Sequence, residues 1–278
     1  MKKLALATAA FVLFTGAAFA ADLAPRTNTK APPPVVQPVY DWTGFYVGGN
    51  AGWVGERASG TSNFIDTDGG LFTNPQSNKV SSSSFIGGIQ GGYNWRVANP
   101  FVLGVEGDFN WLRTSYSFCR QTDIDSANNC TDNGRGFESI SGRTNWLATA
   151  RGRAGVTWAN VLFYGTGGAA FGGVRTTVSL NCLLAGCGTS TIQLAGSSIA
   201  TQIRTGWTAG LGIEAMIARD WSVKGEWLYV DLGSLTNTLV AVGSSASTQS
   251  VVWSHSEHYN IVRAGVNYHF NSPVVAKY

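Results

Sequence analysis

The feature of this sequence that most constrains its fold is the spacing of eight apolar, glycine-rich segments. Within each segment apolar residues recur at every second position, which is typical of a β-strand with one apolar face. The intervals between segments are alternately long and short. The long ones, 55–83, 114–144, 175–203 and 233–257, are rich in Ser, Thr, Asn and Gly. The expected strands are 42–54, 84–96, 101–113, 145–157, 161–174, 204–217, 221–232 and 258–270.

An even number of antiparallel strands, with tight turns at one end and long loops at the other, is the pattern of a bacterial outer-membrane barrel. Asn99-Pro100, Asn160 and Asp220 suit the short turns, because Asn and Asp side chains bond the local backbone. A compact soluble domain rarely carries four such long loops. We therefore predict an all-β fold, an eight-stranded antiparallel up-and-down transmembrane β-barrel over residues 41–270.

The start of the chain predicts export. Lys2 and Lys3 precede an apolar run over 4–17, and Ala18-Phe19-Ala20 follows as a cleavage pattern, so residues 1–20 are interpreted as a signal peptide. The alternative, a membrane anchor, would need a longer run of ~20 residues. Residues 21–40 hold five of the eight prolines and are interpreted as a periplasmic linker. Residues 271–278 are interpreted as a C-terminal extension.

The composition excludes several classes of protein. Charged residues make up 13% of the chain, about half of the usual ~25%, which argues against a disordered chain or a nucleic-acid binder. The 35 glycines argue against a mostly helical fold. The net charge of +3 includes the two lysines of the leader.

The charged residues in the middle of the strands fall on the face opposite the apolar residues. In a soluble β-sandwich this face would be solvated. In a small membrane barrel it would point inward, where buried charges must be paired or hydrated. The balance of four acids and four bases favours the barrel. The predicted interior charge cluster is Glu106, Asp108, Arg151, Arg153, Glu214, Lys224, Glu226 and Arg263.

Tryptophans gather near the strand ends on the apolar face. An indole ring has an apolar body and a polar N–H, so it suits the two membrane–water interfaces. The predicted inner girdle is Trp95, Trp158 and Trp221. The predicted outer girdle is Trp53, Trp111, Trp146 and Trp207.

Two segments carry a resemblance to a known family. They are DWTGFYVGGNAG at 41–52 and VRAGVNYHF at 262–270, which follow the leader and the proline-rich stretch. Together they resemble the small outer-membrane, immunogenic or porin-family proteins of alpha-proteobacteria, which are similar to the OmpA-like transmembrane β-barrel. The resemblance covers essentially residues 1–270. It implies location in the outer membrane, a role in envelope integrity and no catalytic residues.

Family members typically end on the last strand with a Phe that the barrel-assembly machinery reads. Here 271–278 follow Phe270, which leaves Phe270 and Tyr278 as alternative assembly signals. The expected partners are outer-membrane lipid and lipopolysaccharide, the assembly machinery, and host or environmental ligands of the loops, but no nucleic acid. We expect a structural and surface-interacting protein. The alternatives are a narrow porin and, more remotely, a membrane-embedded lipid-modifying hydrolase.

Four cysteines form two pairs within the long loops: Cys119 with Cys130, and Cys182 with Cys187. An exported protein meets an oxidising compartment, so disulfides are expected, and the local pairing is one of three possible connectivities. Zinc is the alternative, but no histidine lies near either pair.

The sequence SHSEH at 254–258 is the single catalytic-looking cluster. His255 and Ser256 are adjacent, and neighbouring residues on a strand point to opposite faces, so a nucleophile–base pair is not expected. A third metal ligand near His255 and His258 is also missing. We therefore expect no enzyme activity, no cofactor and no metal site.

Overall fold

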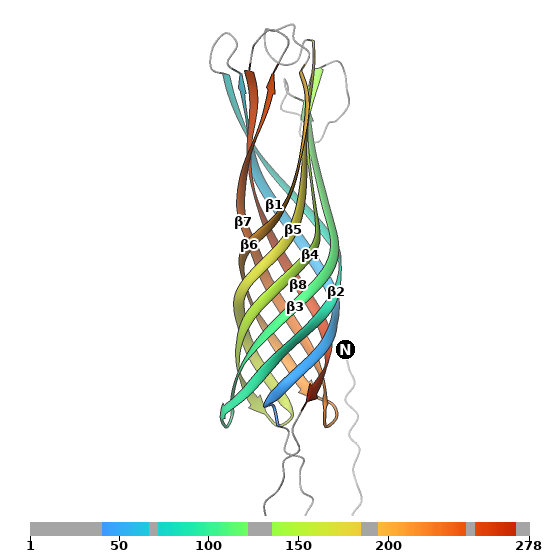
Figure 1. Ribbon diagram of the computed structural model, residues 1–278, viewed down its shortest axis with the longest axis vertical. Coiled ribbons are helices and arrows are strands. Elements are labelled where there is room, and N and C mark those ends of the chain that lie inside the picture. Colours follow the sequence, from blue (N-terminus) through green and yellow to red (C-terminus); the bar gives the residue numbers. More distant parts are fainter. Residues whose placement is uncertain (1–40, 67–71, 122–134, 185–193, 243–247, 271–278) are drawn as a thin grey trace, which may run out of the picture. The chain divides into compact units, whose positions relative to one another are not determined.

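The computed structural model describes residues 41–66, 72–121, 135–184, 194–242 and 248–270, which form eight β-strands (Figure 1). The expected signal peptide, linker and C-terminal extension lie outside these residues. The strands are β1 Gly44–Asp66, β2 Phe72–Ala98, β3 Phe101–Gln121, β4 Arg135–Trp158, β5 Val161–Leu184, β6 Leu194–Met216, β7 Trp221–Val242 and β8 Thr248–Phe270.

The strands close into a barrel in sequence order, and every neighbouring pair is antiparallel. Pairing of β1 with β8 completes the closure and sets Ala51 opposite Ala264. The fold class predicted from the sequence is therefore confirmed. Three predicted tight turns also fall between the strands expected, β2–β3, β4–β5 and β6–β7.

The turn between β4 and β5 differs in detail from the expectation. Ala159, rather than Asn160, has the positive φ, at 54°. The Asn160 side chain instead donates a hydrogen bond of 2.9 Å to the carbonyl of Met216, at the end of β6. Asn160 thus links two turns at the same end of the barrel.

The strands extend well beyond the segments predicted from the sequence, and this corrects the expectation of four long loops. β1 continues from the predicted end at residue 54 to Asp66, and β2 begins at Phe72 instead of residue 84. Period-two alternation is produced by lipid on one side of a strand. Beyond the membrane the outer face meets water instead of lipid, so the Ser- and Thr-rich continuations lose the regular apolar row on that face while still forming ladder hydrogen bonds.

The predicted girdle tryptophans lie on the outer face of the barrel. Six of the seven are exposed and Trp146 is half-buried. Trp146 stacks on Phe109, with ring centroids 5.6 Å apart. We take the membrane-spanning segments as the parts of the strands between the inner and outer rings of tryptophan. The described residues contain no helix of the length and apolarity needed to cross a membrane.

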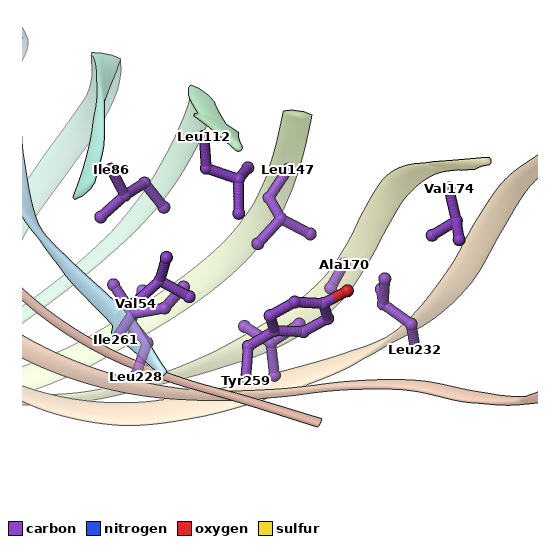
Figure 2. Packing of buried hydrophobic residues seen from close by; sticks show 11 residues of the cluster. Val54, Ile86, Leu112, Leu147, Ala170, Val174, Leu228, Leu232, Tyr259 and Ile261 are labelled. Carbon is purple, nitrogen blue, oxygen red and sulfur yellow. The ribbon is translucent and has the colours of Figure 1, made fainter. Parts of the chain in front are cut away.

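Two apolar layers fill the barrel interior near its two girdles. The lower layer lies beside the short turns and consists of Trp42, Val102, Leu162, Tyr164 and Met216. The upper layer includes the direct sequence neighbours of Trp53, Trp111 and Trp146 and so lies near the outer girdle; Figure 2 shows its packing. Its members are Val54, Ile86, Leu112, Leu147, Ala170, Val174, Leu228, Val230, Leu232, Tyr259 and Ile261.

Trp42 is fully buried in the lower layer and is not a girdle residue. Its ring meets the His269 ring edge-on, with centroids 6.0 Å apart. Trp42, which lies two residues before Gly44, the first residue of β1, therefore packs inside the lower end of the barrel.

Candidate functional site

The eight predicted interior charges all face the lumen and are buried, each with 7% exposure or less. They come from β3, β4, β6, β7 and β8, on the face opposite the exposed apolar residues. Period-two geometry alone places them there, because each strand has one lipid-facing row. The structure brings all eight into one network, placed between the two apolar layers.

Arg151 is the centre of this network. Its guanidinium forms ion pairs with Asp108 at 2.9 Å and Glu226 at 2.9 Å, and a further ion pair with Glu106. Glu106 and Arg151 are direct cross-strand partners on β3 and β4. A planar guanidinium with several donors suits three carboxylates at once.

Arg263 and Lys224 complete the upper part of the network. Arg263 Nη2 lies 2.6 Å from Glu226 and 3.0 Å from Asp108. Lys224 Nζ donates to both carboxylate oxygens of Glu106, at 2.8 and 2.9 Å. Glu106, Asp108 and Glu226 therefore each have more than one cationic partner.

The lower part of the network is built around Glu214. This carboxylate accepts hydrogen bonds from Arg153 at 3.0 Å, Ser222 at 2.6 Å and Asn267 at 2.7 Å. The guanidinium carbon of Arg153 lies 4.7 Å and 5.1 Å from the ring centroids of Tyr46 and Tyr164. Such cation–π contacts help to hold this buried guanidinium in place.

Several inner-face residues were missed as network members by sequence reasoning. Tyr46 donates a hydrogen bond of 2.6 Å to Glu106, and His269 lies 3.3 Å from Glu214. The alternation places both on the polar face, but it contains no sign of which charge each would meet. Their shared parity with the charged residues is the signal that could have identified them.

The network is balanced and tightly packed. Burying an isolated charge costs several kcal/mol, so these charged side chains can be buried only because they form ion pairs with one another. The side chains of Arg151, Asp108 and Glu226 have no exposed surface. These three side chains therefore fill the part of the lumen that they occupy.

A second polar cluster lies above the outer girdle and includes part of the SHSEH segment. His255 Nε2 lies 3.1 Å from Glu257, and Arg204 lies 3.5 Å from the other oxygen of Glu257. Ser256 Oγ lies 3.0 Å from Ser59 Oγ on the neighbouring strand. His255 is buried inside whereas Ser256 takes the opposite face, in agreement with the alternation.

Glu56 faces this second cluster from β1, three positions beyond Trp53. The Tyr259 hydroxyl lies within hydrogen-bond distance of both Glu56 and Glu257, at 3.2 and 3.0 Å. Burial, followed by the repulsion of Glu257, raises the pKa of Glu56 from 4.5 to about 7. Glu56 was missed because the first predicted strand stops at residue 54.

The remaining predicted sites are only partly covered by the described residues. Cys119 is disulfide-bonded, whereas Cys130, Cys187 and the side chain of Cys182 lie outside the description. The predicted pairing therefore remains a prediction. Phe270 ends β8, faces outward and pairs with Phe45 of β1. Among the described side chains, no three His, Cys, Asp or Glu residues converge as metal ligands would.

Comparison with known proteins supplies the family. The model of the outer membrane protein beta-barrel domain matches residues 6–270. The chain belongs to this outer-membrane β-barrel family. The recognition made from the two sequence segments is thereby confirmed, and so is the location in the bacterial outer membrane.

Two relatives of this outer-membrane barrel protein are the 31 kDa outer-membrane immunogenic proteins of Brucella melitensis biotype 1 and Brucella suis biovar 1. Each is 32% identical over 278 residues, covering 97% of this chain and 100% of the relative. Among solved structures, the outer membrane protease OmpT of Escherichia coli is similar with 8% identity and a TM-score of 0.45. That match covers 84% of this chain and 99% of OmpT. A TM-score this low supports no inference about chemistry.

Proposed function

We propose that this outer-membrane barrel protein is a closed structural element of the envelope that presents its outer hairpins to the surroundings. The observation that carries the proposal is the filled lumen. A balanced ion-pair network, whose central side chains have no exposed surface, lies between two apolar layers. A conducting pore would need a continuous hydrated path past Arg151 and Glu226.

The length of the strands supports the surface role. β3 continues ten residues beyond Trp111, to Gln121, and β5 continues to Leu184. Paired backbone gives these extensions a fixed shape above the outer girdle. An extended, ordered hairpin is a suitable scaffold for contacts with ligands of the host or environment.

The arrangement around His255 gives no support for an enzyme. Its recorded side-chain polar partners are Arg204 and Glu257, and among the described residues no Ser, Thr or Cys side chain bonds its ring. A hydrolase of the serine type needs a nucleophile within hydrogen-bond reach of its base. The Arg204–His255–Glu257 group instead neutralises charge within the upper barrel.

Two measurements test the proposal together. Deletion of the gene is expected to sensitise cells to detergent and to large antibiotics that an intact outer membrane excludes, and the wild-type gene is expected to restore resistance. Liposomes that contain the purified protein are expected not to swell in small sugars. Swelling at the rate of a known porin, together with an intact envelope in the deletion strain, would overturn the proposal in favour of the narrow porin.

A further inference from the structure

Two arginines lie side by side on the outer surface, above the girdle. Arg143 of β4 and Arg175 of β5 are direct cross-strand partners, and both are exposed on the outer face. Arg113 of β3 is exposed on the same side, two positions before Ser115, which pairs with Arg143. Three neighbouring strands thus contribute three positive charges to one region.

Arg143 and Arg175 border a polar groove. The groove has a volume of about 490 Å³, and its lining includes Arg143, Arg175, Ser115, Ser117, Ser141 and Thr177. The register explains the arrangement, because Ser117, Ser141 and Thr177 form a cross-strand row directly beside the row of Ser115, Arg143 and Arg175. A row of hydroxyl donors therefore flanks a pair of guanidinium groups.

No described carboxylate neutralises this pair. Within the described residues, neither Arg143 nor Arg175 has an ion pair or a side-chain hydrogen bond, whereas every cation of the interior network has several. Like charges directly opposite on a sheet destabilise the pairing. An anion held between the two guanidinium groups would remove this repulsion, and guanidinium groups bind phosphate oxygens in a bidentate manner.

The position of the groove, just outside the membrane interface, favours a lipid as the source of the anion. Trp111 and Trp146, which are cross-strand partners, mark the membrane interface on β3 and β4, and the arginine row lies three to four residues farther out. On the next strand, Thr201 pairs with Arg175 and lies between exposed Ile199 and Ile203. Phosphate-binding groups beside exposed apolar side chains match a molecule with an anionic headgroup and acyl chains.

We propose that the groove of Arg143 and Arg175 is a binding site for a phosphate group of an outer-leaflet glycolipid. The two guanidinium groups hold the phosphate, the hydroxyl row donates to its oxygens, and Arg113 adds charge beside it. This site rests on the outer-membrane location and the outer face of the barrel, and it is independent of whether the lumen conducts.

The test measures binding of bisphosphorylated lipid A to the full protein purified in detergent, by native mass spectrometry. The site variant is R143Q/R175Q. The matched control is R57Q/K79Q, which removes two exposed positive charges from the neighbouring strands β1 and β2. We expect the site variant to weaken binding about tenfold or more, which corresponds to about 1.4 kcal/mol, and the control to change binding less than twofold.

Two further arms identify the source of the anion. Dephosphorylated lipid A is expected to bind the wild type as weakly as lipid A binds the site variant, and inorganic phosphate is expected to compete poorly. An equal loss of lipid A binding in R143Q/R175Q and R57Q/K79Q would show binding to a diffuse basic surface and would overturn the proposed site. Undiminished binding of dephosphorylated lipid, or full competition by inorganic phosphate, would overturn the assignment to a lipid phosphate. Folding of each variant is checked by heat-modifiable migration on a gel.

Discussion

The Glu106–Lys224 pair offers a direct measure of how strongly the interior charges depend on one another. Lys224 Nζ contacts both oxygens of Glu106, at 2.8 and 2.9 Å, and both side chains are buried. E106Q leaves the network with one excess positive charge, and K224M leaves it with one excess negative charge. The double variant E106Q/K224M is neutral again.

The expected magnitudes follow from burial. Removing one partner of a buried ion pair costs about 3–5 kcal/mol, so the two single variants together should lose roughly 6–10 kcal/mol of unfolding free energy. In the double variant Arg151 still has Asp108 and Glu226, and Tyr46 can still donate to the amide oxygen at position 106. A neutral replacement of similar volume is much less costly, so we expect a coupling energy of at least about 3 kcal/mol.

The assay is reversible urea unfolding in short-chain phospholipid vesicles, followed by the fluorescence of the chain's ten tryptophans. A control cycle combines E106Q with R57Q, because Arg57 lies on the outer face, away from the network. The control cycle should be additive within about 0.5 kcal/mol. Additivity of E106Q and K224M within the same range would show that the two charges are not coupled and that water solvates each of them separately.

Three further predictions use the same unfolding assay. Because the pKa of Glu56 is raised from 4.5 to about 7, the native state holds the extra proton in this window and wild-type stability falls as pH rises through it. The unfolding free energy of E56Q should therefore exceed that of the wild type by an amount that grows with pH to about 3 kcal/mol and stays constant above pH 7. A difference between the two proteins that does not change with pH contradicts this. G168A should cost about 1–3 kcal/mol, because its Cβ would lie 2.1 Å from the carbonyl oxygen of Ala150, whereas G107A, with its nearest atom at 3.7 Å, should be close to neutral; equal effects contradict this. W42A should cost about 3–5 kcal/mol, and a cost below 1 kcal/mol would show that the lower layer is not tightly packed.

Lipid makes much of this fold predictable from the sequence. A strand that crosses a membrane must present apolar residues at every second position, so the faces, the short turns and the inward charges could all be derived. The parts of the strands beyond the membrane could not be predicted, because the alternation ends there. Glu56 lies in β1 beyond the point where the alternation ends, and the sequence offered no reason to extend the strand.

The partners within the lumen could not be predicted because they depend on closure and register. Arg263 of β8 meets Asp108 of β3 across the lumen at 3.0 Å, although 155 positions separate them in the sequence. The burial of Trp42 could not be predicted for a related reason, because only the closed barrel provides the interior space that its ring fills. The Arg143–Arg175 pair could not be predicted either, because it depends on the register of β4 and β5 in segments that were expected to be loops.

Single-channel conductance of the purified protein in a planar bilayer tests whether the paired charges close the lumen. Heat-modifiable migration on a gel establishes that the barrel is folded in the same preparation. A closed lumen predicts no steady conductance at any salt concentration that leaves the barrel folded. A steady conductance that rises with salt would contradict it and would place a hydrated path beside Arg151 and Glu226.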